Sequence, residues 1–169
     1  MLRTAFKEWS SVCRAIGDGR QSLILRKGGI AESGGVFRPE HDRFWLYPTH
    51  HHQPDDKASS GNVIHLSHFV NVAAVSFVQS LDTALKLAGL HIWDEGTVRQ
   101  RFAYRTPGLY VLTVRAYRCD PRDVPERPEY AGCKTWVELA ESVSIEGAEP
   151  VLDDATFATV QAEIAQRLS

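Results

Sequence analysis

The sequence predicts an α+β fold, a single compact domain over residues 1–169, with a mixed, mostly antiparallel sheet or a small β-barrel and flanking helices. Three observations support this class. A chain of 169 residues fits one domain and would leave two very small ones. Helical and strand patterns are mixed without the regular strand–helix–strand rhythm of a parallel sheet. Leu109–Arg118 is apolar on both faces, which is typical of a strand inside a sheet.

Apolar periodicity and capping residues place the helices. Four are predicted, over residues 4–16, 81–87, 94–104 and 154–168. Asp94 is an N-cap candidate for the third, and Asp153 or Asp154 for the fourth. The apolar stripe of the last helix, which includes Phe157, predicts that it packs on the sheet.

Strands and loops fill the rest of the chain. Strands are predicted over residues 21–26, 43–47, 63–79 and 109–118, the third being one long bent strand or two short ones. A further strand or helix resumes at Thr135, with an edge strand at Val143–Ile145. The polar segment after Pro48 is read as a loop, and residues 119–132, which hold three prolines, as an irregular connection.

Composition excludes several classes of protein. Nineteen basic and 21 acidic residues give a formal net charge of -2, which excludes a uniformly basic nucleic-acid coat protein but allows a local basic patch. The three cysteines form no C-x-x-C pair and are expected to be reduced thiols. The N-terminus lacks a signal-peptide pattern, and no apolar run approaches the roughly 20 residues of a membrane span. A cytoplasmic protein that does not enter the membrane is therefore expected.

Several short segments, weak singly, form a specific ordered set. They are Lys7-Glu8-Trp9, Leu25–Ile30, Phe44–Thr49 followed by His52-Gln53, His91-Ile92-Trp93, Arg101-Phe102, Val114–Tyr117 and Tyr130–Val137. This set resembles the bacterial family called domain of unknown function 1802 over nearly the whole chain. The resemblance implies no particular activity. It implies a link to restriction or nucleic-acid metabolism and association with a restriction-type nuclease.

The run Arg26-Lys27-Gly28-Gly29 follows a predicted strand. Backbone N–H groups beside glycines, with two cations, can hold a phosphate. The P-loop spacing is absent, and a tight glycine turn with two solvated cations is the favoured alternative.

Histidines gather around the polar loop. Imidazoles near carboxylates can bind a divalent metal, and a metal-dependent nuclease would use such groups to activate water. On this reading Glu32, His41 and His52 are catalytic candidates, and His41 and His52 are also candidate metal ligands. The favoured alternative is a polar loop with surface histidines.

Basic residues follow one another between Gly96 and Cys119 with no acidic residue among them. They are Arg99, Arg101, Arg105, Arg115 and Arg118. Tyrosines interleave with them, a combination that nucleic-acid surfaces use for phosphate contact and base stacking. An equally weighted alternative pairs Arg115 and Arg118 with the acidic segment over residues 138–154.

Cys133-Lys134 allows two readings as well. A lysine beside a cysteine can lower the pKa of a nucleophilic thiol, whereas a structural turn with a buried Trp136 is the favoured alternative.

The leading hypothesis is a protein that binds nucleic acid, DNA or RNA, or a phosphate-containing ligand. Its candidate contact residues are Arg26, Lys27, Thr49, His52, Gln53, Arg99, Arg101, Arg105, Arg115 and Lys134. Residues 27–32, 41 and 49–53 are expected to approach one another. One alternative is a metal-dependent phosphodiesterase or nuclease, and another is a structural partner of a separate nuclease. Whether the chain is an enzyme stays open at this point.

Overall fold

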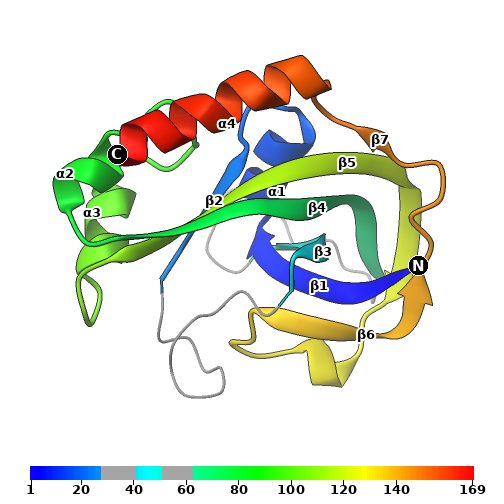
Figure 1. Ribbon diagram of the computed structural model, residues 1–169. Coiled ribbons are helices and arrows are strands. Elements are labelled where there is room, and N and C mark those ends of the chain that lie inside the picture. Colours follow the sequence, from blue (N-terminus) through cyan, green and yellow to red (C-terminus); the bar gives the residue numbers. More distant parts are fainter. Residues whose placement is uncertain (28–40, 51–62) are drawn as a thin grey trace.

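The computed structural model describes residues 1–27, 41–50 and 63–169 and confirms the α+β class. A mixed sheet of seven strands carries four α-helices and does not close into a barrel in the described chain. Figure 1 shows β4 and β5 as long curved ribbons lying side by side, with α4 running across them.

The strands are β1 (Leu2–Trp9), β2 (Leu23–Arg26), β3 (Arg43–Thr49), β4 (Val63–Val78), β5 (Leu109–Pro125), β6 (Trp136–Val143) and β7 (Glu149–Pro150). The helices are α1 (Ser10–Gly17), α2 (Leu81–Leu85), α3 (Glu95–Ala103) and α4 (Asp154–Leu168), with a 3₁₀ turn at Pro128–Tyr130. The strand order is β2-β5-β4-β3-β1-β6, and β7 pairs with β5. Only the β1–β3 pairing is parallel among these strands, so the sheet is mostly antiparallel, as predicted.

The pairing of β4 with β5 is the longest in the sheet. It runs from Val63 opposite Pro125 to Val78 opposite Leu109, with two register shifts on the way. Of the two alternatives predicted over residues 63–79, one long bent strand or two short ones, the structure shows the long bent strand. Each shift adds local twist and bends the ribbon, because unequal numbers of residues oppose each other there.

The predicted helix over residues 4–16 is wrong in its first half. Residues up to Trp9 form β1, and only Ser10–Gly17 is helical. The steps between Phe6, Trp9 and Cys13 fit a helix but cross the strand–helix junction. Pairing of β1 with β3 on one side and with β6 on the other overrides the local pattern, since both neighbours are distant in sequence.

The predicted irregular connection over residues 119–132 is also wrong in part. β5 continues to Pro125 and keeps its pairing with β4. A register shift lies where Leu66 pairs with Arg122 but His68 pairs with Arg118. Pro121 falls within this shift, where a residue without an N–H interrupts no regular ladder.

Helices cover the sheet around three groups of buried side chains. α1 packs on one group through Val12, Cys13 and Ile16. α2, α3 and α4 enclose another, to which α4 contributes Ile164. The predicted caps are confirmed. Asp94 accepts from the N–H of Thr97 at 2.6 Å, and Asp153 does the same for Thr156 at 2.7 Å.

The three cysteines are free thiols, two of them buried and Cys133 exposed. Within the described parts of the chain, none of the helices has the length and apolarity that crossing a bilayer requires.

Phe157 tests how firmly α4 is docked. Its side chain is 8% exposed and lies 5.4 Å from the Arg115 guanidinium. Phe157→Ala should lower the free energy of unfolding by about 3–5 kcal/mol, because it leaves a cavity beneath the helix. Urea or thermal unfolding measures this, with the exposed Gln166→Ala as the control on the same helix. An unchanged melting temperature for Phe157→Ala would show that the helix is not docked.

Candidate functional site

A buried carboxyl group lies at the end of β1. Glu8 is 2% exposed, and its Oε1 accepts a hydrogen bond from the N–H of Trp9 at 2.7 Å. The group is placed there by the fold, because β1 lies between β3 and β6 and α1 begins directly after it. Charged side chains are rarely buried without partners, so its surroundings identify it as a candidate site.

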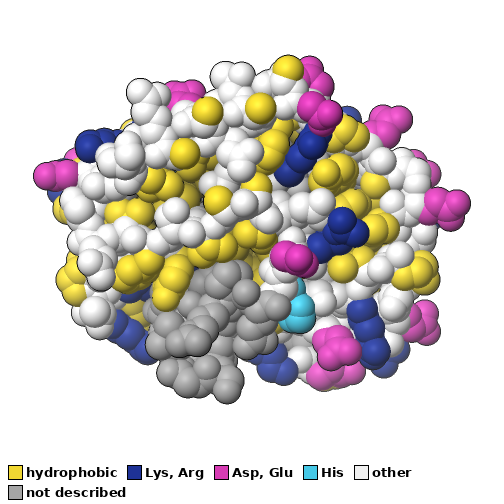
Figure 2. All heavy atoms as spheres, viewed as in Figure 1, with side chains coloured by type: hydrophobic (Ala, Val, Ile, Leu, Met, Phe, Trp, Pro, Cys, Tyr) yellow, Lys and Arg dark blue, Asp and Glu magenta, His cyan; other side chains and the backbone are white. Residues whose placement is uncertain are grey.

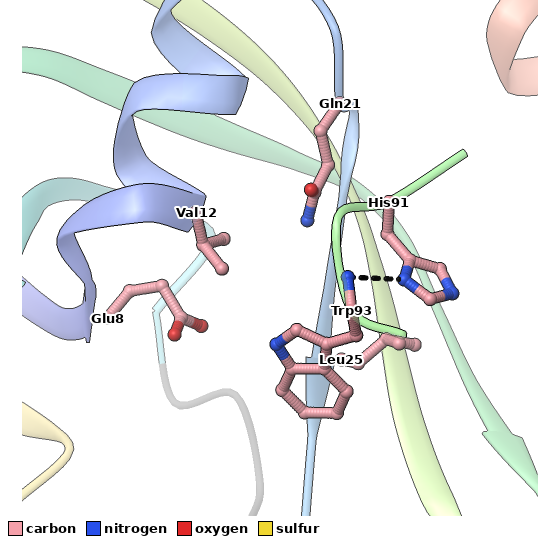
Figure 3. Close-up of a pocket in the computed structure, with 6 residues that line it drawn as sticks. All are labelled: Glu8, Val12, Gln21, Leu25, His91 and Trp93. Carbon is pink, nitrogen blue, oxygen red and sulfur yellow. Dashed lines mark hydrogen bonds between the residues drawn. The ribbon is translucent and has the colours of Figure 1, made fainter. Parts of the chain in front are cut away.

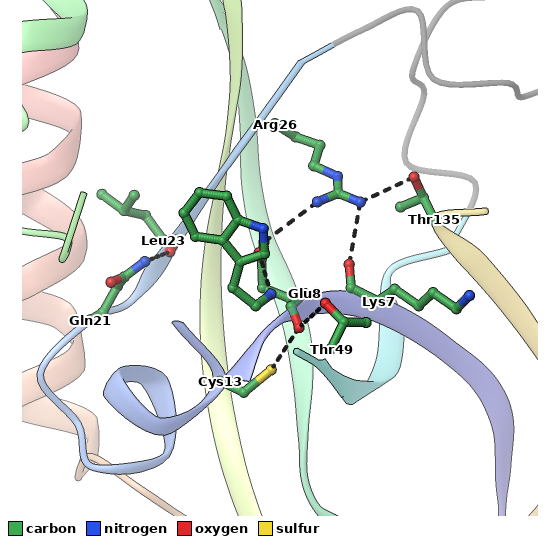
Figure 4. A network of polar contacts seen from close by, with 9 residues as sticks. Lys7, Glu8, Cys13, Gln21, Leu23, Arg26, Thr49 and Thr135 are labelled. Atoms are coloured by element: carbon green, nitrogen blue, oxygen red, sulfur yellow. Dashed lines mark hydrogen bonds and ion pairs between the residues drawn. The ribbon is translucent and has the colours of Figure 1, made fainter. Parts of the chain in front are cut away.

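Arg26 brings a positive charge to this carboxyl from another part of the sheet (Figure 4). Its Nη1 lies 3.8 Å from Oε2 of Glu8, and its Nη2 donates to the carbonyl of Lys7 and to Oγ1 of Thr135, both at 3.2 Å. The guanidinium also stands 4.8 Å from the ring centroid of Phe6. One arginine therefore links β2 with β1 and with the start of β6.

Thr49 completes the arrangement from β3. Its hydroxyl donates to the backbone carbonyl of Glu8 at 3.2 Å. We call Glu8, Arg26, Thr49 and Thr135 the Glu8 cluster. Two of the predicted contact residues, Arg26 and Thr49, thus meet there.

Burial dominates the electrostatics of the cluster. It raises the pKa of Glu8, and the opposing effects of Arg26, the Trp9 N–H and Arg101 are smaller. Burial also raises the pKa of the Cys13 thiol well above its ordinary value, with a further contribution from Glu8. The Glu8 carboxyl therefore takes up a proton more readily than an exposed glutamate does.

A narrow hollow opens beside Glu8 (Figure 3). Its walls are Glu8, Val12, Gln21, Leu25, His91 and Trp93, and in this conformation it does not admit a water molecule. Gln21 fixes one wall, because its Oε1 accepts from the N–H of Ile92 at 3.0 Å. Nδ1 of His91 accepts from the N–H of Trp93 at 3.1 Å, so the neutral ring carries its proton on Nε2. Burial lowers the pKa of His91.

Arginines and aromatic rings continue outward from the hollow. Trp9 and Trp93 have ring centroids 5.6 Å apart, and the Arg101 guanidinium stands 5.5 Å from the Trp9 ring. Just beyond the end of α3, Arg105 stands 5.2 Å from the ring of Tyr104, which is 52% exposed. We call Trp9, Trp93, Arg101, Tyr104 and Arg105 the arginine–aromatic surface.

Other predicted contact residues have partners within the protein. Lys27 is 8% exposed, and its Nζ donates to the carbonyls of Phe102 at 2.8 Å, Gly108 at 2.9 Å and Thr106. This ammonium holds the loop after α3 from the inside. Lys134 donates to the carbonyl of Glu129 at 2.9 Å.

The arginine series separates into different environments. Arg99 pairs with Glu95 one turn earlier at 2.6 Å. Arg115 pairs with Asp154, as the acidic-segment alternative predicted. Arg118 instead donates to the carbonyl of Gly17 at 3.0 Å.

The predicted metal and catalytic residues are only partly placed. The His41 ring stands 5.1 Å from that of Trp136. Glu32, His52 and Gln53 lie outside the described residues. Among the residues that the structure does describe, no three histidine, cysteine or acidic side chains form a group suited to a metal ion.

The predicted convergence of residues 27–32, 41 and 49–53 relied on long loops that fold back across the sheet, and most of these residues lie outside the described ones. The strands on either side of residues 27–42 are separated in the sheet by β5 and β4. Arg26 and Thr49 still meet at Glu8, whereas Lys27 turns toward the loop after α3.

Sequence reasoning missed Glu8, Thr135 and the two tryptophans as site residues. Their local patterns carry no site signal, because a single glutamate in Lys7-Glu8-Trp9 is read as a solvated charge. The available signal was that these residues fall within the segments that carry the family resemblance. The structure brings four other such segments together around Glu8, through Arg26, Thr49, His91 with Trp93, and Thr135.

The raised pKa of Glu8 predicts a pH-dependent stability. The folded state binds this proton more tightly than the unfolded chain, so its contribution is full at acid pH and is lost as pH rises through the folded pKa. The free energy of unfolding of the wild type, relative to Glu8→Gln, should therefore fall as the pH rises above about 4, the ordinary pKa of a glutamate. The total decrease in this free energy is about 1.4 kcal/mol for each unit by which the pKa of Glu8 is higher in the folded than in the unfolded protein.

Urea unfolding across this pH range measures the difference. Glu141→Gln, which removes an exposed carboxyl from β6, reports the general effect of net charge. A wild-type minus Glu8→Gln difference that rises with pH would contradict the assignment.

Comparisons with known proteins show the fold and the family. The sequence matches no curated protein. A crystal structure of a tyrosine-to-phenylalanine variant of ASCH from Zymomonas mobilis is 14% identical, covers 82% of this chain and 90% of its own, and has a TM-score of 0.52. The structure of ASCH from Zymomonas mobilis is 13% identical, with coverage of 82% and 87% and a TM-score of 0.47. The family model "Domain of unknown function (DUF1802)" matches residues 5–163, nearly the whole chain, and this protein therefore belongs to that family.

Proposed function

We propose that this protein binds single-stranded nucleic acid through the arginine–aromatic surface. The observation that carries the proposal is the position of Arg101. Its guanidinium lies over the Trp9 ring, and none of the carboxylates in the described residues stands within ion-pair distance of it. A half-buried arginine on an aromatic ring is suited to a phosphate and an adjacent base.

The end of α3 extends this surface. Arg101 lies in the last turn of α3, and Arg105 lies two residues beyond the helix, with the exposed Tyr104 between them. Unpaired bases stack on aromatic side chains with little dependence on sequence, and nearby cations meet the phosphates. Arg99, which is paired with Glu95, lies outside this surface.

The contact surface is therefore narrower than the arginine series suggested. Lys27, Arg115 and Lys134 use their charges within the protein. Figure 2 shows basic and acidic side chains interspersed over one face of the molecule, in keeping with the net charge of -2. Affinity then depends on a few arginines together with stacking.

Other expectations stay predictions. Contacts by His52 and Gln53, the cytoplasmic location and the association with a restriction-type nuclease belong to this group. Metal-dependent cleavage by Glu32, His41 and His52 is the alternative activity, and breakdown of an oligonucleotide only in the presence of Mg²⁺ would favour it.

Replacing Arg101 and Arg105 together by Gln tests the proposal. Affinity for a fluorescently labelled single-stranded oligonucleotide should fall, and the slope of log affinity against log salt should decrease by about one to two. Fluorescence anisotropy over a salt series measures both quantities, with RNA and DNA strands compared.

The matched control replaces Arg20 and Arg127 by Gln, which changes the net charge equally. These arginines pair with Asp18 and Glu129 and are not members of the arginine–aromatic surface. An equal loss of affinity in the control would mean that binding is a general charge effect. Absence of binding by the wild type at low salt would overturn the proposal.

A further inference from the structure

We propose that the Glu8 cluster, with the two indole rings beside it, is a pocket for one unstacked guanine base of a bound strand. The inference rests on the proposed function, because it names the base that the arginine–aromatic surface delivers to the cluster. It gives the buried Glu8 carboxyl a role in binding. Contact between the arginines and phosphate would not involve this carboxyl.

Glu8 has acceptor capacity that the described residues do not fill. An ionised carboxylate offers about four acceptor positions. The Trp9 N–H occupies one, and the Arg26 Nη1 lies 3.8 Å from Oε2, beyond hydrogen-bond distance. Because the carboxyl is 2% exposed, water does not readily supply the missing donors. A ligand that brings donors relieves this cost.

Guanine fits the polarity of the cluster. Its N1–H and N2 amino group form two adjacent donors, which match the two oxygens of one carboxylate. Adenine, cytosine and uracil each present a single donor site flanked by an acceptor on this edge. A cationic ligand is disfavoured, since Arg26 and Arg101 both act on Glu8.

The two indole rings provide stacking surfaces. The ring centroids of Trp9 and Trp93 are 5.6 Å apart, with an interplanar angle of 42°. A base between two parallel rings needs about 7 Å, twice the stacking rise of DNA. Figure 3 shows the Glu8 carboxylate on the side of the hollow that faces the Trp93 ring.

The hollow is closed in this conformation. The rings are 5.6 Å apart and a sandwiched base needs about 7 Å, so binding requires the Trp93 segment to move outward by roughly 1–2 Å. This segment connects α2 with α3 and has no regular secondary structure. The Ile92 N–H donates to Gln21, and Arg167 of α4 donates to the carbonyls of Lys86 and Ala88, whereas the bond from the Trp93 N–H to His91 lies within the segment. Arg101, over the Trp9 ring, is placed to meet the phosphate beside an inserted base.

Base substitution in the ligand tests the inference on the wild-type protein. An oligouridine of about ten nucleotides is compared with the same strand carrying one central guanosine. The guanosine should tighten binding about tenfold in fluorescence anisotropy. Inosine, which lacks the N2 amino group, should lose most of this gain, and 7-deazaguanosine, which keeps the donor edge, should retain it.

A protein variant tests the same contact. Glu8→Gln should abolish the preference for guanosine, which is measured as the ratio of affinities for the strands with and without guanosine. Glu141→Gln is the matched control and should keep this preference. If Glu8→Gln does not fold, the inosine comparison still decides the question, since it uses the wild-type protein.

The outcomes separate the two proposals. Equal affinity for strands with and without guanosine, or with guanosine and inosine, would overturn the guanine pocket and leave the proposed function standing. Failure of the wild type to bind any of these strands would overturn both.

Discussion

The continuous pairing of β4 with β5 is the constraint on which the rest of the structure depends. It extends from Val63 to Val78, and its two register shifts bend the ribbon instead of ending it. β2 joins the free side of β5, while β3, β1 and β6 follow from β4. The bend brings β2 and β6, the two edge strands in this order, so close together that Arg26 on β2 reaches Thr135, the residue before β6. The candidate site is therefore a product of sheet curvature.

Within that site the burial of the Glu8–Arg26 pair lowers the stability of the fold but provides charged groups that can recognise a ligand. Removing two charges from water is expensive, and a pair 3.8 Å apart recovers only part of that cost. Arg26 also donates to the carbonyl of Lys7 on β1 and to the hydroxyl of Thr135, the residue before β6. An apolar pair of similar size would join the same strands more cheaply. Retention of the charges is thus better explained by a ligand than by stability alone.

The sequence was informative where structure is locally determined. The helix caps at Asp94 and Asp153, the long strand after Val63 and the docking face of α4 were all predicted, because a cap or an apolar pattern is contained in a few neighbouring residues. β1 was missed because its partners lie far along the chain. The site was only half predicted for the same reason. Arg26 and Thr49 were identified as polar residues near strand ends, whereas the burial of Glu8 depends on contacts that no local pattern contains.

The placement of β1 also has a consequence for how the chain folds. β1 lies between β3 and β6, and the Arg26–Thr135 contact spans 109 residues. Loop closure over such distances is entropically costly and slows folding. During synthesis Glu8 leaves the ribosome long before Thr135 has been made. Until then the Glu8 cluster lacks one of its four residues. A nascent or truncated chain that ends before Thr135 therefore holds Glu8, Arg26 and Thr49 without the hydroxyl that Arg26 contacts.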